Sequence, residues 1–258
     1  MARTGRFGER GMKARALAGR KVLVTRALED AERWASRLTL LGAVPVVFPC
    51  LILEMIDNQE IRQSLHDALR EARWLVLTST RGAVAAGVLL GGELPAHVRV
   101  AVVGPTTARA AIGSVGRVDL MAKTASSGGL GAELADVVRD DSGMGALGVV
   151  VAGAVGGRDE AEIALRAAGV AVTRLDLYRT TPIPRATKKR QLGAEGIQDV
   201  LLASPSAVRG LMNAAVVPVD ARVIAIGPTT SAAARAAGLA VTAEARRPSL
   251  EGMIEVMS

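Results

Sequence analysis

An internal duplication limits the folds that this chain can adopt. Residues 99–108 read RVAVVGPTTA and residues 222–231 read RVIAIGPTTS, an offset of 123 residues. Two further segment pairs keep the same order at offsets of 125 and 127, namely 78–83 with 203–208, and 41–44 with 168–171. A preserved order with a slowly drifting offset is expected of a duplicated unit whose loops have changed slightly. We therefore expect two copies of one structural half.

Each copy has the pattern of a parallel-sheet α/β protein. From Lys21 onward, short Val-rich runs alternate with amphipathic segments such as 31–41 and 61–72, in which apolar residues recur at helical spacing. Aromatic residues make up only 2% of the chain, so the core must consist of aliphatic side chains. Strands are predicted at Val22–Thr25, Val44–Phe48, Trp74–Thr78, Val100–Val103, Val149–Ala152, Val170–Leu177, Val200–Ala203 and Val223–Ile226, with weaker candidates near Val118 and Ala240.

Composition excludes several classes of function. No apolar run approaches the roughly 20 residues of a membrane-spanning helix, so a soluble protein without membrane contact is expected. Cys50 is the only cysteine and there are two histidines, which argues against a disulfide or a bound metal and favours a cytoplasmic location. Residues 1–19 hold five basic side chains and one acidic one and contribute +4 of the net +7. We expect this stretch to be a disordered tail with Met12 as an alternative start, and the remaining +3 indicates an anionic small molecule rather than nucleic acid.

Four turns rich in Ser, Thr or Gly each follow a predicted strand and open a predicted helix. This is where parallel α/β sheets bind ligands, and free amides at helix starts attract anions. The hydroxyls of these turns could equally serve only as helix caps, an alternative that the residues alone leave open. If the two halves face each other, the turns line one cleft with donors for several carboxylates or phosphates. They are Thr78–Arg81, Gly104–Thr107, Ser204–Ser206 and Gly227–Thr230.

Three further side chains are candidates for the site. Tyr178 is the only tyrosine and lies at the end of a predicted strand, where its hydroxyl could donate a proton or simply remain hydrated. Arg26 follows the first strand, and Arg81 lies in one of the four turns; each could form a bidentate contact with a carboxylate. No nucleophile elbow, Walker loop or dinucleotide fingerprint is present; the segment Gly153–Gly157 is the nearest approach to a phosphate loop.

The order of these motifs resembles uroporphyrinogen-III synthase. A Val-Thr-Arg first strand is followed by Thr-Ser-Thr-Arg, Gly-Pro-Thr-Thr, Tyr-Arg-Thr, Ser-Pro-Ser-Ala-Val and a second Gly-Pro-Thr-Thr, over roughly residues 20–256. The resemblance implies a lyase of porphyrin, tetrapyrrole and heme biosynthesis. Such an enzyme cyclises the linear tetrapyrrole hydroxymethylbilane with inversion of ring D and loss of water, and needs no cofactor and no metal. It further implies a cytoplasmic monomer that transiently contacts the preceding deaminase.

Residue by residue, the resemblance makes Tyr178 the group that assists loss of the substrate hydroxyl. Further positions would bind the substrate, with the two arginines as the weaker matches: Arg26, Ser79, Arg81, Thr107, Ser204, Ser206, Thr229 and Thr230. It also implies two flavodoxin-like lobes joined by a two-stranded bridge. One lobe would be discontinuous, covering residues 20–49 and 181–258, and the other would cover 52–178.

Two other functions fit the same residues. A two-lobed module without turnover could bind or sense an anionic ligand such as a tetrapyrrole. A flavodoxin-like protein could hold a flavin phosphate on the Ser and Thr turns, although the few aromatic residues are poorly placed to cover an isoalloxazine ring. An absorbance scan for bound flavin separates this last reading from the others.

Overall fold

The computed structural model describes residues 17–92, 94–140 and 148–257. Within them the chain forms two compact units: unit 1 contains the residues up to Leu53 and those from Thr181 onward, and unit 2 contains Glu54–Thr180. Most of the expected tail, residues 1–16, lies outside the described residues. Residues 17–19 do not belong to a tail, because Leu17 is fully buried and the Gly19 amide donates to the Gly42 carbonyl at 2.9 Å. Burying one leucine contributes about 2 kcal/mol, which explains why the folded unit includes it.

Unit 1 is built on a five-stranded parallel sheet in the order β13-β12-β10-β1-β2. A small second sheet pairs β9 with β11. The elements are β1 (Lys21–Val24), α2 (Leu28–Leu40), β2 (Val44–Val47), β9 (Arg190–Gln191), the 3-10 helix η2 (Leu192–Glu195), β10 (Asp199–Leu202), α8 (Pro205–Ala214), β11 (Ala215–Val216), β12 (Arg222–Ala225), α9 (Pro228–Ala236), β13 (Val241–Glu244) and α10 (Leu250–Met257).

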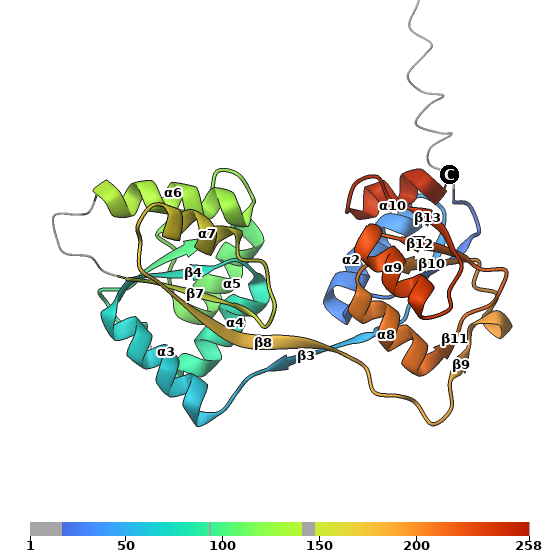
Figure 1. The fold of residues 1–258 in the computed structure, drawn as a ribbon, viewed down its shortest axis with the longest axis horizontal. Helices are drawn as coiled ribbons and strands as arrows, with labels where there is room; N and C mark the ends of the chain where they lie inside the picture. The colour runs from blue at the N-terminus through green and yellow to red at the C-terminus, as the bar shows by residue number, and fades with distance from the viewer. Residues whose placement is uncertain (1–16, 93, 141–147, 258) are drawn as a thin grey trace, which may run out of the picture. The chain divides into compact units, whose positions relative to one another are not determined.

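Unit 2 is built on a sheet in the order β3-β8-β7-β4-β5-β6, in which β8 to β6 are parallel (Figure 1). Its elements are β3 (Leu51–Met55), α3 (Gln59–Glu71), β4 (Ala72–Leu77), α4 (Thr80–Leu90), β5 (Arg99–Val102), α5 (Pro105–Val115), β6 (Leu120–Met121), α6 (Ser127–Asp140), β7 (Gly148–Ala154), α7 (Glu160–Ala167) and β8 (Val172–Pro182). All ten predicted strands are present, most of them with ends shifted by one or two residues.

The two sheets have the same strand order once the duplication is taken into account. The repeat aligns β7, β8, β10, β12 and β13 with β1, β2, β4, β5 and β6, so both sheets follow the flavodoxin-like order 2-1-3-4-5. Each sheet takes two strands from one copy and three from the other. The predicted fold class, a duplicated α/β protein with parallel flavodoxin-like sheets, is therefore confirmed.

Successive side chains of each strand point to opposite faces of the sheet, so each sheet has a hydrophobic core on both faces. In β4, Leu75 and Leu77 face α3, α4 and α5, whereas Trp74 and Val76 face α6 and α7. Figure 1 shows these two helix groups on opposite sides of the unit 2 sheet. Unit 1 is arranged likewise, with α8 and α9 on one face and α2 and α10 on the other. Because both faces are covered, the central strands are continuously apolar, which is the reason that they could be recognised in the sequence.

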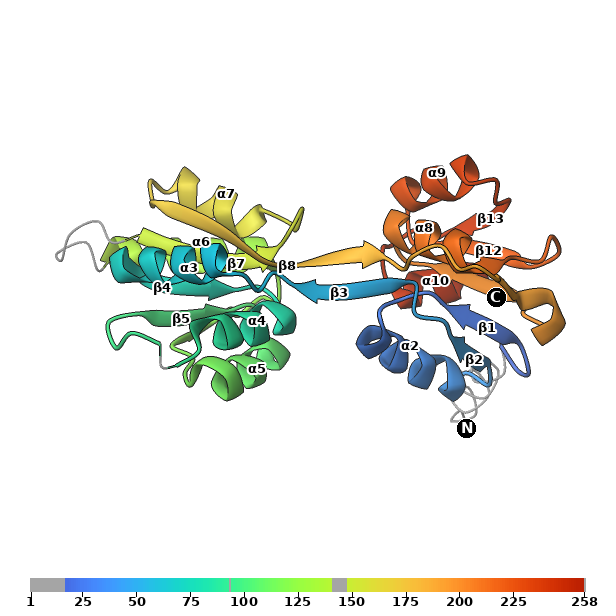
Figure 2. The same ribbon diagram turned by 90° about the horizontal axis from the view of Figure 1, so that it is seen from below.

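Strands β3 and β8 lie side by side where the chain passes between the units (Figure 2). The amide of Ile56 donates to the carbonyl of Leu177 at 2.9 Å, and the amide of Ile183 donates to that of Cys50 at 3.0 Å. Cys50, just before the first strand, thus pairs near Ile183, just after the second, and the later residue Ile56 pairs near the earlier residue Leu177, so the two strands are antiparallel. The bridge expected from the resemblance is thus a hydrogen-bonded two-stranded ribbon. Among the described helices, none has the length and apolarity required to cross a membrane.

Candidate functional site

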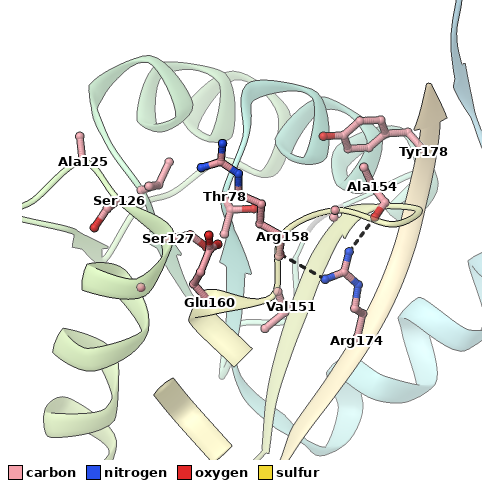
Figure 3. Close-up of a pocket in the computed structure, with 14 residues that line it drawn as sticks. Thr78, Ala125, Ser126, Ser127, Val151, Ala154, Arg158, Glu160, Arg174 and Tyr178 are labelled. Atoms are coloured by element: carbon pink, nitrogen blue, oxygen red, sulfur yellow. Dashed lines mark hydrogen bonds between the residues drawn. The ribbon is translucent and has the colours of Figure 1, made fainter. Parts of the chain in front are cut away.

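A pocket of about 660 Å³ opens at the carboxyl ends of the unit 2 strands (Figure 3). Its walls include the residues that follow three neighbouring strands: Thr78 after β4, Val103 after β5, and Gly153 with Ala154 at the end of β7. From β4 the chain extends the sheet in one direction through β5 and β6, and later adds β7 on the other side of β4. The pocket therefore lies at the topological switch point, where open α/β sheets bind ligands.

Residues 153–157, at the end of β7 and in the turn that leads towards α7, form one wall of the pocket. We call this segment the glycine-rich loop. Gly156 has a φ of 63°, in the left-handed region that favours glycine. The backbone of the loop is tied to β8, because the Val155 amide donates to the Tyr178 carbonyl at 2.9 Å. This is the segment that the sequence marked as the nearest approach to a phosphate loop.

The side chain of Arg174, on β8, binds the same loop. Its Nη2 donates to the Ala154 carbonyl at 2.6 Å (Figure 3). Its Nε donates to Asp176 Oδ1 at 2.8 Å, and its Nη1 contacts the buried carboxylate of Glu162. Desolvation lowers the pKa of the Arg174 guanidinium, but the hydrogen bonds to Asp176 and Glu162 outweigh it and the pKa is raised above its ordinary value. The guanidinium therefore stays charged and bound to the loop.

The start of α6 forms the opposite wall. Ser126 Oγ accepts a hydrogen bond from the Gly129 amide at 3.1 Å, which is a helix cap. The Oγ of Ser127 is buried and has no hydrogen-bond partner in the described part of the chain. Arg158 and Glu160 bring one positive and one negative side chain to the pocket. Hydroxyl groups, helix amides and an arginine together can bind an anionic group of a ligand.

Tyr178 lies on the pocket wall with its ring beside Ala154 (Figure 3). Its hydroxyl is 3.0 Å from Oγ of Ser79, and either oxygen could be the donor. Ser79 in turn caps α4, where its Oγ accepts from the Gly82 amide at 3.0 Å. The tyrosine hydroxyl is therefore held by a fixed helix cap, and it is the one phenol available to act as a proton donor in this pocket.

Two other predicted site residues belong to unit 2. Thr107 is buried, with 5% of its surface exposed, in the first turn of α5, and Arg81 is half-buried in the first turn of α4. Of the four predicted residues in this unit, only Tyr178 lines the pocket, and Ser79 reaches it through the tyrosine hydroxyl.

The remaining predicted residues belong to unit 1. Ser204 caps α8 by accepting from the Ala207 amide at 3.1 Å, and Ser206 accepts from Arg209 at 3.1 Å. Arg26 pairs with Asp30 at 2.9 Å and lies 4.8 Å from the centre of the Trp34 ring. In the first turn of α9, Thr230 is buried and its neighbour Thr229 is exposed.

The two Gly-Pro-Thr-Thr turns have nearly identical backbones. Gly104 and Gly227 have φ of 172° and 173° and ψ of 179° and 178°, and each precedes a proline at the first helical position. Both conformations are extended. The duplication has thus preserved the turn geometry as well as its sequence.

Sequence reasoning missed Arg174, Glu162, Arg158, Ser126 and Ser127. One signal was available for Arg174, because Arg174, Asp176 and Tyr178 occupy alternate positions of a predicted strand and so share a polar face. No sequence signal connected this face to Glu162 on α7. Groups of three or more His, Cys, Asp or Glu that could hold a metal ion are absent from the described residues.

Comparison with known proteins gives three findings. The chain aligns structurally with the uroporphyrinogen-III synthetase of Helicobacter pylori at a TM-score of 0.56 and 12% identity, covering 92% of this chain and 97% of that one. A mutant uroporphyrinogen III synthase of Thermus thermophilus aligns at a TM-score of 0.49 and 18% identity, covering 93% and 97%. The porphyrin biosynthesis protein HemD of Ruminiclostridium josui is 38% identical over 66 residues, which span 26% of this chain and only 13% of that protein.

A fourth finding is the match to a family model. The model of the family described as uroporphyrinogen-III synthase HemD covers residues 32–255, from the first helix of unit 1 through all of unit 2 and on to the last helix. It therefore includes most of both copies of the duplicated half, without β1, and every predicted site residue except Arg26. The chain belongs to the uroporphyrinogen-III synthase family.

Proposed function

We propose that this protein cyclises hydroxymethylbilane to uroporphyrinogen III, with inversion of ring D and loss of water. Family membership supports this reaction, and the observation that carries it is the position of Tyr178, whose hydroxyl is held at the wall of a pocket by Ser79. The sequence resemblance had assigned the same tyrosine to departure of the substrate hydroxyl.

The reaction is a net loss of water without oxidation or reduction. The nitrogen lone pair of the pyrrole that carries the hydroxymethyl group expels the hydroxyl, which leaves as water after accepting a proton by way of Tyr178. The resulting electrophilic carbon is attacked by a substituted carbon of ring D, which gives a spiro intermediate. The bond from this ring D carbon to the methylene bridge of ring C then breaks, and the bridge carbon re-attaches to the unsubstituted carbon of ring D, which inverts the ring. Loss of the proton from that carbon restores the aromatic rings and the proton balance. Because the pyrrole nitrogen already assists departure, the phenol need supply only one hydrogen bond.

The substrate carries eight carboxylates, and we propose that both units contribute to their binding. In unit 2 this proposal is supported by the glycine-rich loop, the start of α6 and the side chain of Arg158, which all line the pocket. In unit 1 the proposed contacts are Arg26, Ser204, Ser206, Thr229 and Thr230, and in unit 2 they also include Ser79, Arg81 and Thr107. Amides and hydroxyls suit this task because they bind carboxylates without requiring one buried positive side chain for each carboxylate.

The test is to add the full chain to hydroxymethylbilane made in situ and to separate the uroporphyrin isomers after oxidation. An excess of isomer III over the control without protein supports the proposal. Isomer I alone, which forms spontaneously, contradicts it. If the protein then still binds the linear tetrapyrrole, the non-catalytic binding module becomes the better description.

A further inference from the structure

The guanidinium of Arg174 joins three segments of unit 2 at one point. It contacts the Ala154 carbonyl of the glycine-rich loop, the carboxylate of Asp176 on its own strand, and the carboxylate of Glu162 on α7. A weaker contact of 3.5 Å reaches the Arg158 carbonyl. The Arg174 side chain is 21% exposed and that of Glu162 only 4%. This cluster is thus largely shielded from solvent, where hydrogen bonds between charged groups are strong.

The loop is shaped to accept this guanidinium. A Cβ atom added at Gly153 would lie 3.3 Å from Arg174 Nη2, and one added at Gly157 would lie 3.1 Å from the same atom and 3.0 Å from the Ala154 oxygen. That oxygen accepts from Arg174 and also from the Gly157 amide at 2.9 Å. A side chain at either glycine would therefore crowd the Arg174 guanidinium.

The same loop fixes Tyr178. Ala154 is the partner of Tyr178 in the β7–β8 ladder, beyond a shift of register that follows Gly153. The next residue, Val155, donates its amide to the Tyr178 carbonyl. The Ala154 carbonyl and the Val155 amide belong to one peptide group, so Arg174 binds one end of the group whose other end holds the tyrosine backbone.

We propose that Arg174 is a positioning residue, which acts through the loop to fix the orientation of Tyr178 in the pocket. Arg174 is not assigned to the substrate. Its role in turnover rests on the proposed function, whereas its effect on the tyrosine does not.

The direct test uses the fact that Tyr178 is the only tyrosine of the chain. The full chain labelled with 3-fluorotyrosine gives a single 19F resonance in the folded state. We expect Arg174→Met to shift or broaden this resonance, and Arg174→Lys to do so to a smaller extent, because lysine keeps the charge but cannot contact the loop and both carboxylates at once. An unchanged resonance in both variants would overturn the proposal, whatever the protein catalyses.

Arg166→Met is the matched control. Arg166 also pairs with Glu162, at 3.5 Å, but its side chain is 53% exposed, and within the described residues it forms no hydrogen bond or ion pair with the loop or β8. Its removal weakens the same buried carboxylate pair and leaves the contact with Ala154 intact. A resonance change as large in Arg166→Met as in Arg174→Met would mean that Glu162 pairing, and not the loop contact, determines the environment of the tyrosine.

Turnover supplies the second test. If isomer III is formed, Arg174→Met is expected to lower kcat about tenfold in the parent chain but at most about twofold in a Tyr178→Phe background, since residues that act through one another are not additive. Two effects that simply multiply would show a merely structural role and contradict the proposal. If Arg174→Met does not fold, the same comparison is made with Arg174→Lys.

Discussion

The hydroxyl of Tyr178 and the hydroxyl of Ser79 lie 3.0 Å apart although 99 residues separate them in the chain. The serine comes from the first copy of the duplicated half and the tyrosine from the second, and the unit 2 sheet brings them together because it combines strands of both copies. One serine oxygen thus contacts the tyrosine and caps α4. Removing this hydroxyl should therefore affect both stability and turnover, and a control that only caps a helix separates the two effects.

Ser79→Ala should cost about 1 kcal/mol of stability through the lost cap and should also slow formation of isomer III. Ser249→Ala is the matched control, because Ser249 caps its helix through the Gly252 amide at 3.1 Å. Urea unfolding should show similar losses for both variants, with slower turnover only in Ser79→Ala. Equal turnover in the two would separate Ser79 from the reaction.

Tyr178→Phe should slow formation of isomer III by roughly tenfold without abolishing it, since the loss of one hydrogen bond of about 1.4 kcal/mol corresponds to that factor. The phenyl ring should keep the packing, so the unfolding midpoint should stay close to that of the parent. The measurement is the initial rate at saturating hydroxymethylbilane. An unchanged rate would remove the tyrosine from the mechanism.

Unit 1 depends on a buried charge. Asp199 is fully buried at the start of β10 and accepts from Arg20 at 2.6 and 2.8 Å, while Arg222 lies 3.7 Å away. Arg20→Met should therefore cost about 3 kcal/mol, because the carboxylate would lose its main partner. Arg139→Met, which removes an exposed pair with Asp136, should cost less than about 1 kcal/mol. Denaturant unfolding compares them, and equal losses would show that Asp199 is not held by Arg20.

Two helical glycines should respond to alanine with opposite signs. At Gly210 an added Cβ would lie 1.9 Å from the Cys50 carbonyl oxygen, whereas at Gly113 nothing lies within 4 Å. Gly210→Ala should lose about 2 kcal/mol or more, because α8 must move away from the backbone at Cys50. Gly113→Ala should gain about 0.5–1 kcal/mol from helix propensity. Thermal unfolding of both variants tests this, and a stable Gly210→Ala would mean that α8 shifts at little cost.

Burial raises the pKa of the Cys50 thiol to about 12. The folded protein should then resist a thiol reagent at about pH 8, and the single thiol should react fully once the chain is unfolded. Above pH 9 the unfolded chain loses this proton while the folded chain keeps it, so the contribution of Cys50 to stability is complete below that pH and falls as the pH rises towards 12. The stability difference from Cys50→Ala should shrink by about 2 kcal/mol between pH 8 and 10.5. Rapid reaction in the folded state would contradict the burial of the thiol.

The fold was predictable because its signals are local. Continuous apolar strands such as Val149–Ala152 and the repeated Gly-Pro-Thr-Thr turns each lie within a few residues, and duplication supplied every signal twice. The structure confirmed the fold class and the ten predicted strands, and the match to the family model over residues 32–255 confirmed the family. Tyr178 and Ser79 were selected from short motifs, and their roles in binding and catalysis stay predictions.

Which of these residues come into contact depends on the tertiary structure. The contact of Tyr178 with Ser79, and of Arg174 with Glu162 and the Ala154 carbonyl, requires β7 and β8 of the second copy to pair beside β4 of the first. Strand pairing of this kind depends on burial between distant segments, which no local residue pattern reports. The discontinuous lobes were expected only from the resemblance to the family. The residue pattern predicted ten strands that are all present, but it did not predict β3, β9 or β11. The exchange of strands between the two copies is what places Tyr178 and Arg174 at one pocket, with Ser79 bound to the tyrosine hydroxyl.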